Sequence, residues 1–544
     1  MFLKIRLSKI FQIIFILILI VNIYLFLHSL IYKSPKYLGN HKIIVDDEGK
    51  ILSWINPQSN AYATVVNIAW DFIKNKIPIE PCGLPGYMVS CSYNLESGYA
   101  TYNSLDMAGL FGEFVDSVVP YYAFTGDWSF VKIVQDMFDY ALQLGVGLTP
   151  SNWEWPNMPY AWSPGETGIK IWYPTGKVIY SGRVEPDKAG EFGLGLLKLY
   201  QLTNNETYLN AAINIANVLA SKVRDGNSTH SPWPFRVMPK DGKILVEYTG
   251  NVVGELNLLD ALIDLSLGDI NKYIIARDKA REFLINHVIP NNDWRYYFED
   301  YPDNCPTKSE FNADETVRYI LNHIDWIPNY EIHIKSIWKW VENILGEHSW
   351  RVYGVVPISE QTIDIYCGEF SHTARHASVK AQYATLKSDQ KIKEEAFRLF
   401  NWASYAVQPD TGYVLFSANN LNNYPEVWYT DGYADYIRHF MVGMSAFPEW
   451  APPEESHLVK SSGIVNYINY SPNFINYTVF SASKTPFIDV FRINFIPSKI
   501  LADGIELYLR NDLQYPGYTL NSIDNGDFIL KIQHTGYKNI YIEK

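Results

Sequence analysis

The middle of the chain repeats one unit, in which a turn of small or acidic residues precedes an amphipathic helical pattern. Such a repeat limits the possible folds more than any other feature of the sequence. A weaker copy lies at Asn329–His333, and the clear copies are Thr125–Val131, Thr203–Leu209, Gly268–Ile274 and Lys387–Ile392. With a first helix near 59–74, the pattern predicts six helices that begin near residues 59, 128, 206, 271, 329 and 389.

A long loop and a second helix follow each of these six helices. The second helices are expected to begin near residues 103, 187, 251, 312, 371 and 430. They are richer in glycine and alanine, as in Met107–Gly112 and Ala189–Gly195, and small side chains let helices approach closely. Twelve helices in six hairpins predict a mainly α fold, a closed (α/α)6 toroid over residues 59–450. An open, solenoid-like stack is the structural alternative.

The last part of the chain has a different periodicity. After a short linker at 451–456, apolar residues alternate with polar ones in Phe491–Phe495 and Phe528–Ile532. Asn525 and Gly526 form a dipeptide that is typical of a two-residue hairpin turn. This pattern predicts a small antiparallel, β-sandwich-like domain over residues 457–544.

The N-terminal segment Ile10–Tyr32 is a run of 23 residues without a charged side chain, long enough to cross a bilayer as a helix. Its end lacks the small residues of a signal-peptide cleavage site. We therefore expect an uncleaved membrane anchor, a single transmembrane helix within residues 1–36, and a linker over 37–58. The flanking Lys and Arg residues favour a body outside the cytoplasm, and a cytosolic body on the same anchor is the alternative.

The composition limits the class of ligand that the protein can bind. Charged residues make up 19% and aromatic residues 15% of the chain, and the formal net charge is −13. An acidic chain does not suit nucleic acid, whose phosphates require a basic surface. A surface of uncharged polar groups and aromatic rings suits uncharged polar ligands, sugars above all. We expect no cofactor and no metal, and the oligomeric state stays open.

Four cysteines allow three pairings. Cys82 and Cys91 bracket a short segment rich in Pro and Gly, whereas Cys305 and Cys367 lie far apart in the sequence. We favour the pairs Cys82–Cys91 and Cys305–Cys367. Four unpaired buried thiols are the alternative.

The six punctuated hairpins and the C-terminal β module resemble the six-hairpin glycosidase superfamily and its related toroid lyases and epimerases. The resemblance covers about residues 59–450 and rests on the repeat pattern, without a motif that is diagnostic of one family. It implies a carbohydrate site at the end of the toroid where the long loops meet the N-termini of the inner helices. Because a fold does not fix an activity, the residues at this mouth carry the functional argument.

The six long loops at this mouth, the mouth loops, cover roughly residues 77–103, 145–186, 224–250, 290–311, 348–370 and 406–429. They hold eight of the 16 tryptophans of the chain, and several stand beside an arginine. An indole ring can stack on a sugar face, and a guanidinium can hydrogen-bond hydroxyls or pair with a uronate carboxylate. The predicted substrate-binding residues of the loops are Trp155, Trp233, Arg236, Trp294, Arg295, Trp350 and Arg351. Packing of these aromatic rings between the loops and the toroid is the alternative. Tyr429 and Tyr433, four residues apart on one helix face, are predicted to line a further sugar subsite.

Carboxylates cluster in the first turns of the predicted inner helices: Asp106, Asp187, Glu191, Glu255, Asp314, Glu315 and Asp431. Glycoside cleavage needs two carboxyl groups, one to protonate the leaving oxygen and one to activate water or attack the sugar. The predicted catalytic acids are Glu255, Asp314 and Asp431. Helix capping is the alternative for each, because helix N-termini favour acids, and Asn312–Glu315 has the spacing of a capping box. Glu255 is the least cap-like of them.

The segment Glu369–His376 is not explained by capping, because cations oppose the helix dipole at an N-terminus. His372 and His376 share one helix face with Arg375. The dipole and the guanidinium are expected to lower both imidazole pKa values and leave neutral bases at pH 7. We predict a catalytic role for His372 and substrate binding for His376 and Arg375. A structural role is one alternative, and a zinc site is another, although the pair lacks the Glu of the zinc motif.

These patterns predict a membrane-anchored glycoside hydrolase that acts on an extracellular or cell-envelope glycan, as a poly- or oligosaccharide. The first alternative is a uronate lyase or C5-epimerase in which His372 or a loop tyrosine is the base. Its carboxylate-binding arginines would be Arg295, Arg351 or Arg375. A non-catalytic glycan-binding toroid is the second alternative.

Overall fold

The computed structural model describes residues 36–77, 92–94, 107–143, 147–161, 171–172, 178–179, 182–297, 303–363, 368–418, 426–428, 430–480, 486–536 and 538–544. Within these ranges twelve α-helices form six hairpins. The first helices of the hairpins are α2 (Ala61–Asn75), α4 (Ser129–Ala141), α6 (Glu206–Lys222), α8 (Ile270–Phe283), α10 (Tyr330–Ile344) and α12 (Gln390–Ala403). The second helices are α3 (Met107–Thr125), α5 (Pro186–Thr203), α7 (Val253–Asp264), α9 (Glu310–Asn322), α11 (Phe370–Lys387) and α13 (Tyr436–Ala446).

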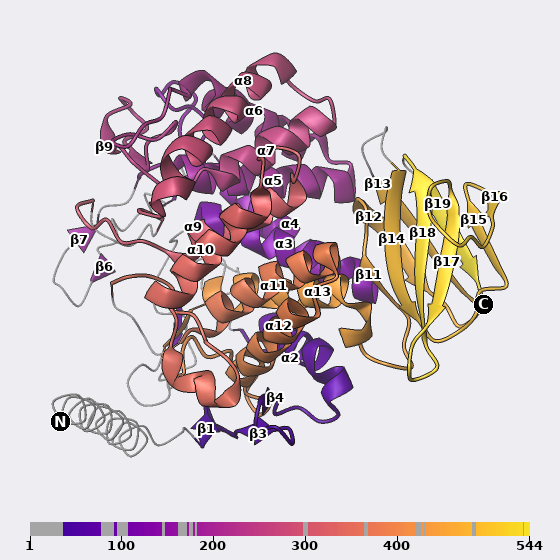
Figure 1. Cartoon of the computed structure of the whole chain (residues 1–544). Helices are drawn as coiled ribbons and strands as arrows, with labels where there is room; N and C mark the ends of the chain where they lie inside the picture. Colours follow the sequence, from indigo (N-terminus) through magenta and orange to yellow (C-terminus); the bar gives the residue numbers. More distant parts are fainter. Residues whose placement is uncertain are drawn as a thin grey trace, which may run out of the picture.

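The second helices form a closed inner ring (Figure 1). Each of them packs against the next, from α3 through α5, α7, α9 and α11 to α13, and α13 packs against α3 again. An open stack would leave α3 and α13 apart. The predicted toroid of six helical hairpins is therefore confirmed, and the helices begin within a few residues of the expected positions.

The repeated turn in the sequence contains the N-cap of three outer helices, α6, α8 and α12. The side chain of Asn205 accepts a hydrogen bond from the backbone N–H of Thr207, at 3.0 Å, before α6. Asp389 does the same for Lys391 before α12, and Asp269 caps α8. These side chains replace the hydrogen bonds that the first turn of a helix lacks. The repeat in the sequence therefore consists of a polar N-cap followed by a helix with one apolar face.

Glycine allows three inner helices to touch at the backbone. A Cβ on Gly190 of α5 would lie 2.4 Å from the backbone nitrogen of Glu255, and one on Gly254 of α7 would lie 2.2 Å from the carbonyl oxygen of Asp187. A Cβ on Gly112 of α3 would lie 2.8 Å from the carbonyl oxygen of Glu191. Three acidic residues are thus brought to the contacts of α3, α5 and α7 because their neighbours have no side chain.

Nine strands build the C-terminal domain as two antiparallel sheets. One sheet has the order β11-β14-β18-β17 and the other has the order β12-β13-β19-β15-β16. The strands are β11 (His457–Lys460), β12 (Ile464–Tyr470), β13 (Phe474–Phe480), β14 (Pro486–Ile493), β15 (Lys499–Ala502), β16 (Ile505–Leu507), β17 (Gly517–Ser522), β18 (Phe528–Thr535) and β19 (Lys538–Glu543). Tyr477 of β13 meets Phe491 of β14 at 5.4 Å between ring centroids and donates a hydrogen bond to Asp489, so the two sheets face each other.

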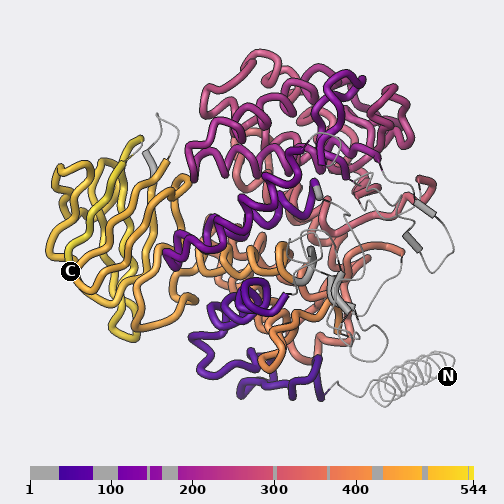
Figure 2. The backbone as a smooth tube through the Cα atoms, turned by 180° about the vertical axis from the view of Figure 1, so that it is seen from behind, coloured from indigo at the N-terminus to yellow at the C-terminus, as the bar shows by residue number. Residues whose placement is uncertain are grey.

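This β domain packs on the C-terminal end of α3 (Figure 2). His457 stacks on Phe124 with ring centroids 3.9 Å apart, and the hydroxyl of Tyr470 donates to the carbonyl oxygen of Ala123 at 2.6 Å. Arg492 donates to the carbonyl oxygen of Glu449 at 3.1 Å. The β domain therefore lies at the end of the toroid opposite to the N-termini of the inner helices, which leaves the mouth uncovered by it.

Short strands flank the toroid. The segment before α2 forms β1 (Tyr37–Leu38), β2 (His41–Lys42), β3 (Ile44–Val45) and β4 (Ile51–Leu52). The mouth loops contain β5 (Ser92–Asn94), β6 (Ile171–Trp172), β7 (Val178–Ile179), β8 (Arg236–Val237), β9 (Ile244–Val246) and β10 (Glu426–Trp428). The first segment is tied to α12 by an ion pair between Asp46 and Arg398 at 2.6 Å.

Two expectations fall outside the described residues. The apolar segment Ile10–Tyr32 precedes them, and none of the helices from residue 36 onward that the structure describes is long and apolar enough to span a membrane. Of the four cysteines only Cys305 lies within them, so the pairs Cys82–Cys91 and Cys305–Cys367 stay predictions.

The glycine contacts predict a position-specific effect of an added methyl group. Replacing Gly190 with Ala should lower the free energy of unfolding by about 2 kcal/mol, because the new Cβ meets rigid backbone. Gly193→Ala on the same helix is the matched control. There the Cβ would meet the end of the Leu258 side chain, which can move, and alanine adds about 1 kcal/mol of helix propensity. Urea unfolding of both variants measures the difference, and equal effects would contradict the close approach.

Candidate active site

The four tryptophans of the mouth loops that were predicted to bind sugar are core residues. Trp233 and Trp294 have no exposed surface, and Trp155 and Trp350 are almost fully buried. The indole N–H of Trp233 donates to the carbonyl oxygen of Leu219 in α6, at 2.8 Å. The predicted sugar-stacking role does not fit these four residues, because their rings have no face open to a ligand. The alternative, packing of the loops onto the toroid, describes them.

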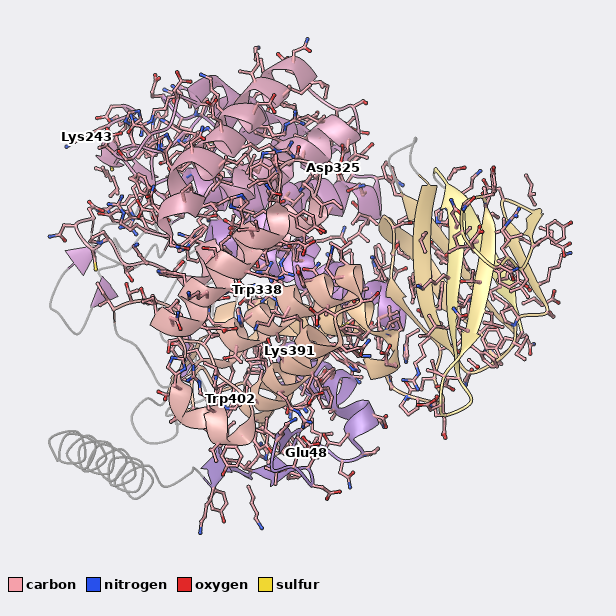
Figure 3. All side chains as sticks on the ribbon, in the orientation of Figure 1. Glu48, Lys243, Asp325, Trp338, Lys391 and Trp402 are labelled. Carbon is pink, nitrogen blue, oxygen red and sulfur yellow. The ribbon has the colours of Figure 1, made fainter. Side chains whose placement is uncertain are left out.

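Trp350 shows how this packing works. It meets Trp402 of α12 at 5.7 Å between ring centroids, and Trp402 stacks on Phe370 of α11 at 4.6 Å. Trp402 lies low in the toroid and Trp338 near its middle, both among the helices of the last hairpins (Figure 3). The loop aromatic ring therefore closes the space between an outer and an inner helix.

Two of the predicted arginines are held by internal carboxylates. The guanidinium of the buried Arg236 lies 2.5 Å from Glu185 and 3.2 Å from Asp303. Arg295 donates two hydrogen bonds to Asp293, at 2.6 and 2.7 Å. These partners occupy the groups that were expected to bind a substrate carboxylate.

The remaining residues predicted at the mouth lie in different surroundings. Arg351 is exposed at the surface of a 3-10 turn, η5 (His348–Tyr353). Tyr433 is completely buried, stacks on Phe72 and donates to the carbonyl oxygen of Gly412, so it belongs to the core and not to a sugar subsite. Tyr429 and the side chain of Asp431 lie outside the described part of the chain, and their roles stay predictions.

Two acid–imidazole pairs join α9 to α11. His372 Nδ1 lies 2.7 Å from Glu310 Oε2, and His376 Nδ1 lies 2.7 Å from Asp314 Oδ2. Both acids and both imidazoles have a spacing of four residues, so the pairs follow each other by one turn on two parallel helices. All four side chains are buried.

Glu310 was missed from the sequence because the helix was expected to begin at Asn312. The structure begins α9 at Glu310, and Ser309 is the N-cap, with its hydroxyl oxygen accepting from the N–H of Asn312 at 3.2 Å. The supposed capping box from Asn312 to Glu315 is therefore absent from α9. The amide of Asn312 instead donates to the carbonyl oxygen of Trp294. The serine three residues before Asn312 was the signal that could have placed Glu310 in the first turn.

The two histidines differ in charge at pH 7, since His372 is neutral and His376 is protonated. Burial lowers the pKa of His372, with Glu310 opposing this shift and Arg375 adding to it, so the expected neutral imidazole is confirmed there. Burial also works to lower the pKa of His376, but Asp314 and Glu342 outweigh it and raise the pKa to about 9. The expectation of a neutral His376 is therefore wrong. Neither carboxylate is near it in the sequence.

This ion pair also changes the role of Asp314. A buried carboxylate bonded to an imidazolium is a structural partner, because losing or gaining a proton there would leave a buried charge unpaired. The predicted catalytic role does not fit Asp314. The imidazolium of His376 is likewise used inside the protein, between Asp314 and Glu342, so it is not placed to bind substrate.

Arg375 is surrounded by three carboxylates from two other inner helices. Its guanidinium lies 2.7 Å from Glu310 and 3.3 Å from Glu315 on α9, and it hydrogen-bonds Asp435 at the end of the π-helical turn η7 (Thr430–Asp435) that precedes α13. Arg438 of α13 bonds Glu315 and Asp435 as well, at 3.0 and 2.8 Å. This side of the ring is therefore a buried network of balanced charges, in which Arg375 is not placed to bind a substrate carboxylate.

The opposite side of the ring, on α3, α5 and α7, holds acids without such compensation. Neither carboxyl oxygen of Glu255 has a hydrogen-bond partner among the described residues, and the side chain is fully buried. Burial first, and then Asp187, raises the pKa of Glu255 well above its ordinary value. Burial also raises the pKa of Glu191, to about 8, and that of Glu113 well above its ordinary value.

Asp187 is the neighbour of Glu255 with polar partners. It accepts a hydrogen bond from the amide of Asn251 at 3.2 Å, and the ammonium group of Lys188 lies 3.5 Å away. The two carboxyl groups thus have different surroundings. The close approach of α5 and α7 at Gly190 and Gly254 is what brings them together.

A column of stacked groups joins the two sides of the ring. The ammonium of Lys188 lies 3.2 Å from the ring centroid of Tyr297, which stacks on Phe311 at 3.9 Å. The guanidinium of Arg375 lies 4.3 Å from the centroid of Phe311. Cations at both ends of an aromatic pair are favourable because they face the negative ring surfaces. The column covers the first turns of α5, α9 and α11.

Among the residues that the structure describes, one group of side chains could hold a metal ion. Glu360, Glu369 and His372 can each bring a ligand atom within 4.8 Å of the others, and His372 Nε2 lies 3.8 Å from Glu360 Oε1. This set mixes carboxylate and imidazole, which suits a divalent first-row ion. It differs from the His372 and His376 pair considered from the sequence, because His376 is turned towards Asp314 and Glu342.

No protein-family profile and no curated protein sequence matches the chain. Among solved structures, it is similar to a family 76 glycoside hydrolase from a bovine Bacteroides thetaiotaomicron strain, with 13% identity, a TM-score of 0.49, and coverage of 72% of this chain and 78% of that chain. A D-mannose isomerase has 9% identity and a TM-score of 0.48 over 72% of this chain and 96% of that chain. A GH127 β-L-arabinofuranosidase from Geobacillus stearothermophilus T6 has 10% identity and a TM-score of 0.41, over 89% and 80%. The chain's own closed ring of hairpins establishes the six-hairpin fold, which the sequence resemblance predicted.

The His376 pair predicts a pH dependence of stability. The folded pKa of about 9 lies above the ordinary value of 6.5, so the pair stabilises fully below pH 6.5 and loses its contribution as pH rises through 9. The corresponding free energy is about 3 kcal/mol. His376→Gln should lower stability at pH 6.5 and flatten the decline between pH 6.5 and 9. Urea unfolding across this range measures both slopes, and parallel curves for the two proteins would contradict the assignment.

Proposed function

We propose that the protein is a carbohydrate-active enzyme, a glycoside hydrolase in which Glu255 is the general acid and Asp187 is the second carboxylate. One observation carries the proposal: a fully buried carboxyl group without a hydrogen-bond partner among the described residues lies beside a carboxylate that has two. Buried groups of this kind are rare unless they have a function. Their place in the first turn of α7 and the first turn of α5 is the mouth of the toroid.

The two environments suit the two roles. A carboxyl group with a raised pKa holds a proton at neutral pH and can give it to the glycosidic oxygen as the bond to the leaving sugar breaks. Asp187, with Lys188 and Asn251 as partners, can take a proton from the attacking water or attack the anomeric carbon itself. Water supplies the hydroxyl group and the proton that complete the products and restore Glu255.

The charges of the mouth favour a neutral glycan over a uronate. Among the described residues, Arg236, Arg295 and Arg375 are held by internal carboxylates. The protonated acids on α3, α5 and α7 can hydrogen-bond sugar hydroxyls, whereas the carboxylate of Asp187 repels a substrate carboxylate. Of the three arginines expected to bind the substrate of a uronate lyase or epimerase, Arg295 and Arg375 are therefore engaged by carboxylates, and Arg351 is exposed.

The assignment predicts a loss of turnover without a loss of folding. Glu255→Gln and Asp187→Asn should each lower kcat by about 10²- to 10⁴-fold, the usual contribution of a general acid or base. Glu113→Gln is the matched control, because Glu113 is also a buried acid with a raised pKa but lies on α3, away from the pair. Release of reducing ends from neutral glycans by the full chain is the measurement. Full activity of Glu255→Gln, or an equal loss in Glu113→Gln, would contradict the proposal.

A second candidate is an isomerase or epimerase that uses His372 as the base. The observation that favours it is the lowered pKa of His372, which leaves a neutral imidazole beside Glu310 in the mouth. Such an enzyme exchanges a carbon-bound hydrogen of the sugar with solvent and releases no reducing ends. Uptake of solvent deuterium that is lost in His372→Gln and kept in Glu255→Gln would identify this activity. Binding of a glycan without either reaction would identify a non-catalytic toroid.

We also propose that the chain is anchored in a membrane through Ile10–Tyr32, with its body outside the cytoplasm. The length of the uncharged segment and the lysines on both sides of it support this proposal. Flotation of the full chain with lipid vesicles after alkaline extraction tests the anchor, and protease protection in sealed cells tests the orientation. A chain that is extracted by alkali has no such anchor.

A further inference from the structure

The described chain begins at the rim of the mouth. Gly39 lies against Leu415 and the carbonyl oxygen of Tyr405, and His41 Nε2 lies 2.9 Å from the carbonyl oxygen of Val407. These partners follow the outer helix α12 and open the last mouth loop. The strands β1, β3 and β4 accordingly lie far from the β domain, which occupies the other end of the molecule (Figure 1).

The sequence places this rim close to the end of the apolar segment. Three residues, 33–35, separate Tyr32 from residue 36, the first described residue. A fully extended chain spans at most 3.3–3.6 Å per residue, so residue 36 lies within about 14 Å of Tyr32. If Tyr32 is at a membrane surface, the rim of the mouth is also at that surface.

The rim exposes apolar side chains at the place that the short link to the proposed anchor holds close to the lipid. Tyr37 is 64% exposed, Ile44 39%, Val45 40% and Val352 58%. Val352 comes from another mouth loop, but the next glycine, Gly354, lies against Lys50 in the hairpin that carries Ile44 and Val45. Two neighbouring segments therefore both place exposed apolar groups at the rim.

Basic side chains stand among these apolar groups. Lys36, Lys42 and Arg351 are all exposed, next to Tyr37, within the first strands and next to Val352. Aromatic and aliphatic side chains with adjacent cations are the combination that binds the interface of a bilayer, where rings enter the headgroup layer and cations meet phosphates. The apolar core of a contact with a second protein chain is depleted of charged residues, so such a contact would not require these cations.

We propose that the rim face, formed by Tyr37, Ile44, Val45 and Val352 with the basic residues beside them, rests on the lipid bilayer. This proposal rests on the membrane anchor proposed above. It directs the mouth of the toroid to the membrane and the β domain away from it. The substrates of this orientation are glycans held at the membrane surface, as distinct from chains free in solution.

The β domain supplies an internal control. Ile505, Tyr508 and Leu509 are exposed to 70, 65 and 61%, so they are at least as accessible and as apolar as the rim face. They belong to the edge of the β domain, at the end of the molecule opposite to the mouth. A probe that detects apolar exposure alone would find both patches, whereas a probe carried by lipid would find only the rim face.

Photochemical labelling of the full chain tests the orientation. The chain is reconstituted in vesicles of phosphatidylcholine and phosphatidylglycerol that contain a lipid with a photoreactive headgroup, and the adducts are mapped by mass spectrometry. We expect the peptides with Tyr37, Ile44–Val45 and Val352 to carry at least five times as many adducts as those with Ile505–Leu509. Equal labelling of the two patches overturns the proposal, as does preferential labelling of the β domain.

Two variants separate this result from its alternatives. The double change Ile44→Asp and Val45→Asp should reduce rim labelling several-fold, whereas Ile505→Asp with Tyr508→Asp should leave it unchanged, with both proteins folded by circular dichroism. Cross-links between two copies through the rim face, without lipid adducts, would assign the face to a dimer and overturn the proposal. A chain that does not float with vesicles overturns the anchor and the orientation together. A chain that floats but is labelled equally on both patches overturns the orientation alone.

Discussion

The buried guanidinium of Arg375 holds three inner helices in one arrangement. It reaches Glu310 and Glu315 on α9 and Asp435 before α13 from its own position on α11. A buried charge network of this kind is stable only when each member keeps its partners, since one unpaired charge costs several kcal/mol. Burial alone would raise the pKa of Glu315, but Arg318, Arg438 and Arg375 lower it to about 2. The network therefore fixes both the register of the helices and the charges of its members.

The paired charges of α9, α11 and α13 contrast with the acids on the other side of the ring, on α3, α5 and α7. The cations of α9, α11 and α13 named here have carboxylate partners in this network, and burial outweighs their effect on the pKa values of Glu113 and Glu191. Glu113, Glu191 and Glu255 respond by holding protons. The result is a ring with one half of paired charges and another half in which Glu191 and Glu255 hold protons near Asp187. The proposed catalytic pair belongs to the second half.

The sequence was sufficient for the parts of the structure that depend on local patterns. The caps at Asn205, Asp269 and Asp389 recur with the amphipathic helices, so the number and order of the hairpins could be predicted. Glycines such as Gly190 and Gly254 mark inner helices because only a residue without a side chain permits the backbone contact. The alternation of the last 88 residues is also local, since each strand shows its two faces in its own sequence. Glu255 was singled out because the sequence placed it four residues into its helix, whereas α7 begins at Val253 and Glu255 lies in its first turn.

The roles of individual side chains depended on partners that are distant in the sequence. His372 and His376 look alike in one segment, yet Asp314, 62 residues earlier, makes only His376 an imidazolium. Trp233 and Trp294 look like rim aromatics until the outer helices that cover them are known. In the folded protein Glu255 is expected to be protonated at neutral pH. Infrared difference spectroscopy of the carboxylic acid C=O stretch, wild type minus Glu255→Gln at pH 7, measures this protonation. We expect a protonated-acid band that is lost in the variant, and loss of a carboxylate band in its place would show that Glu255 is ionised.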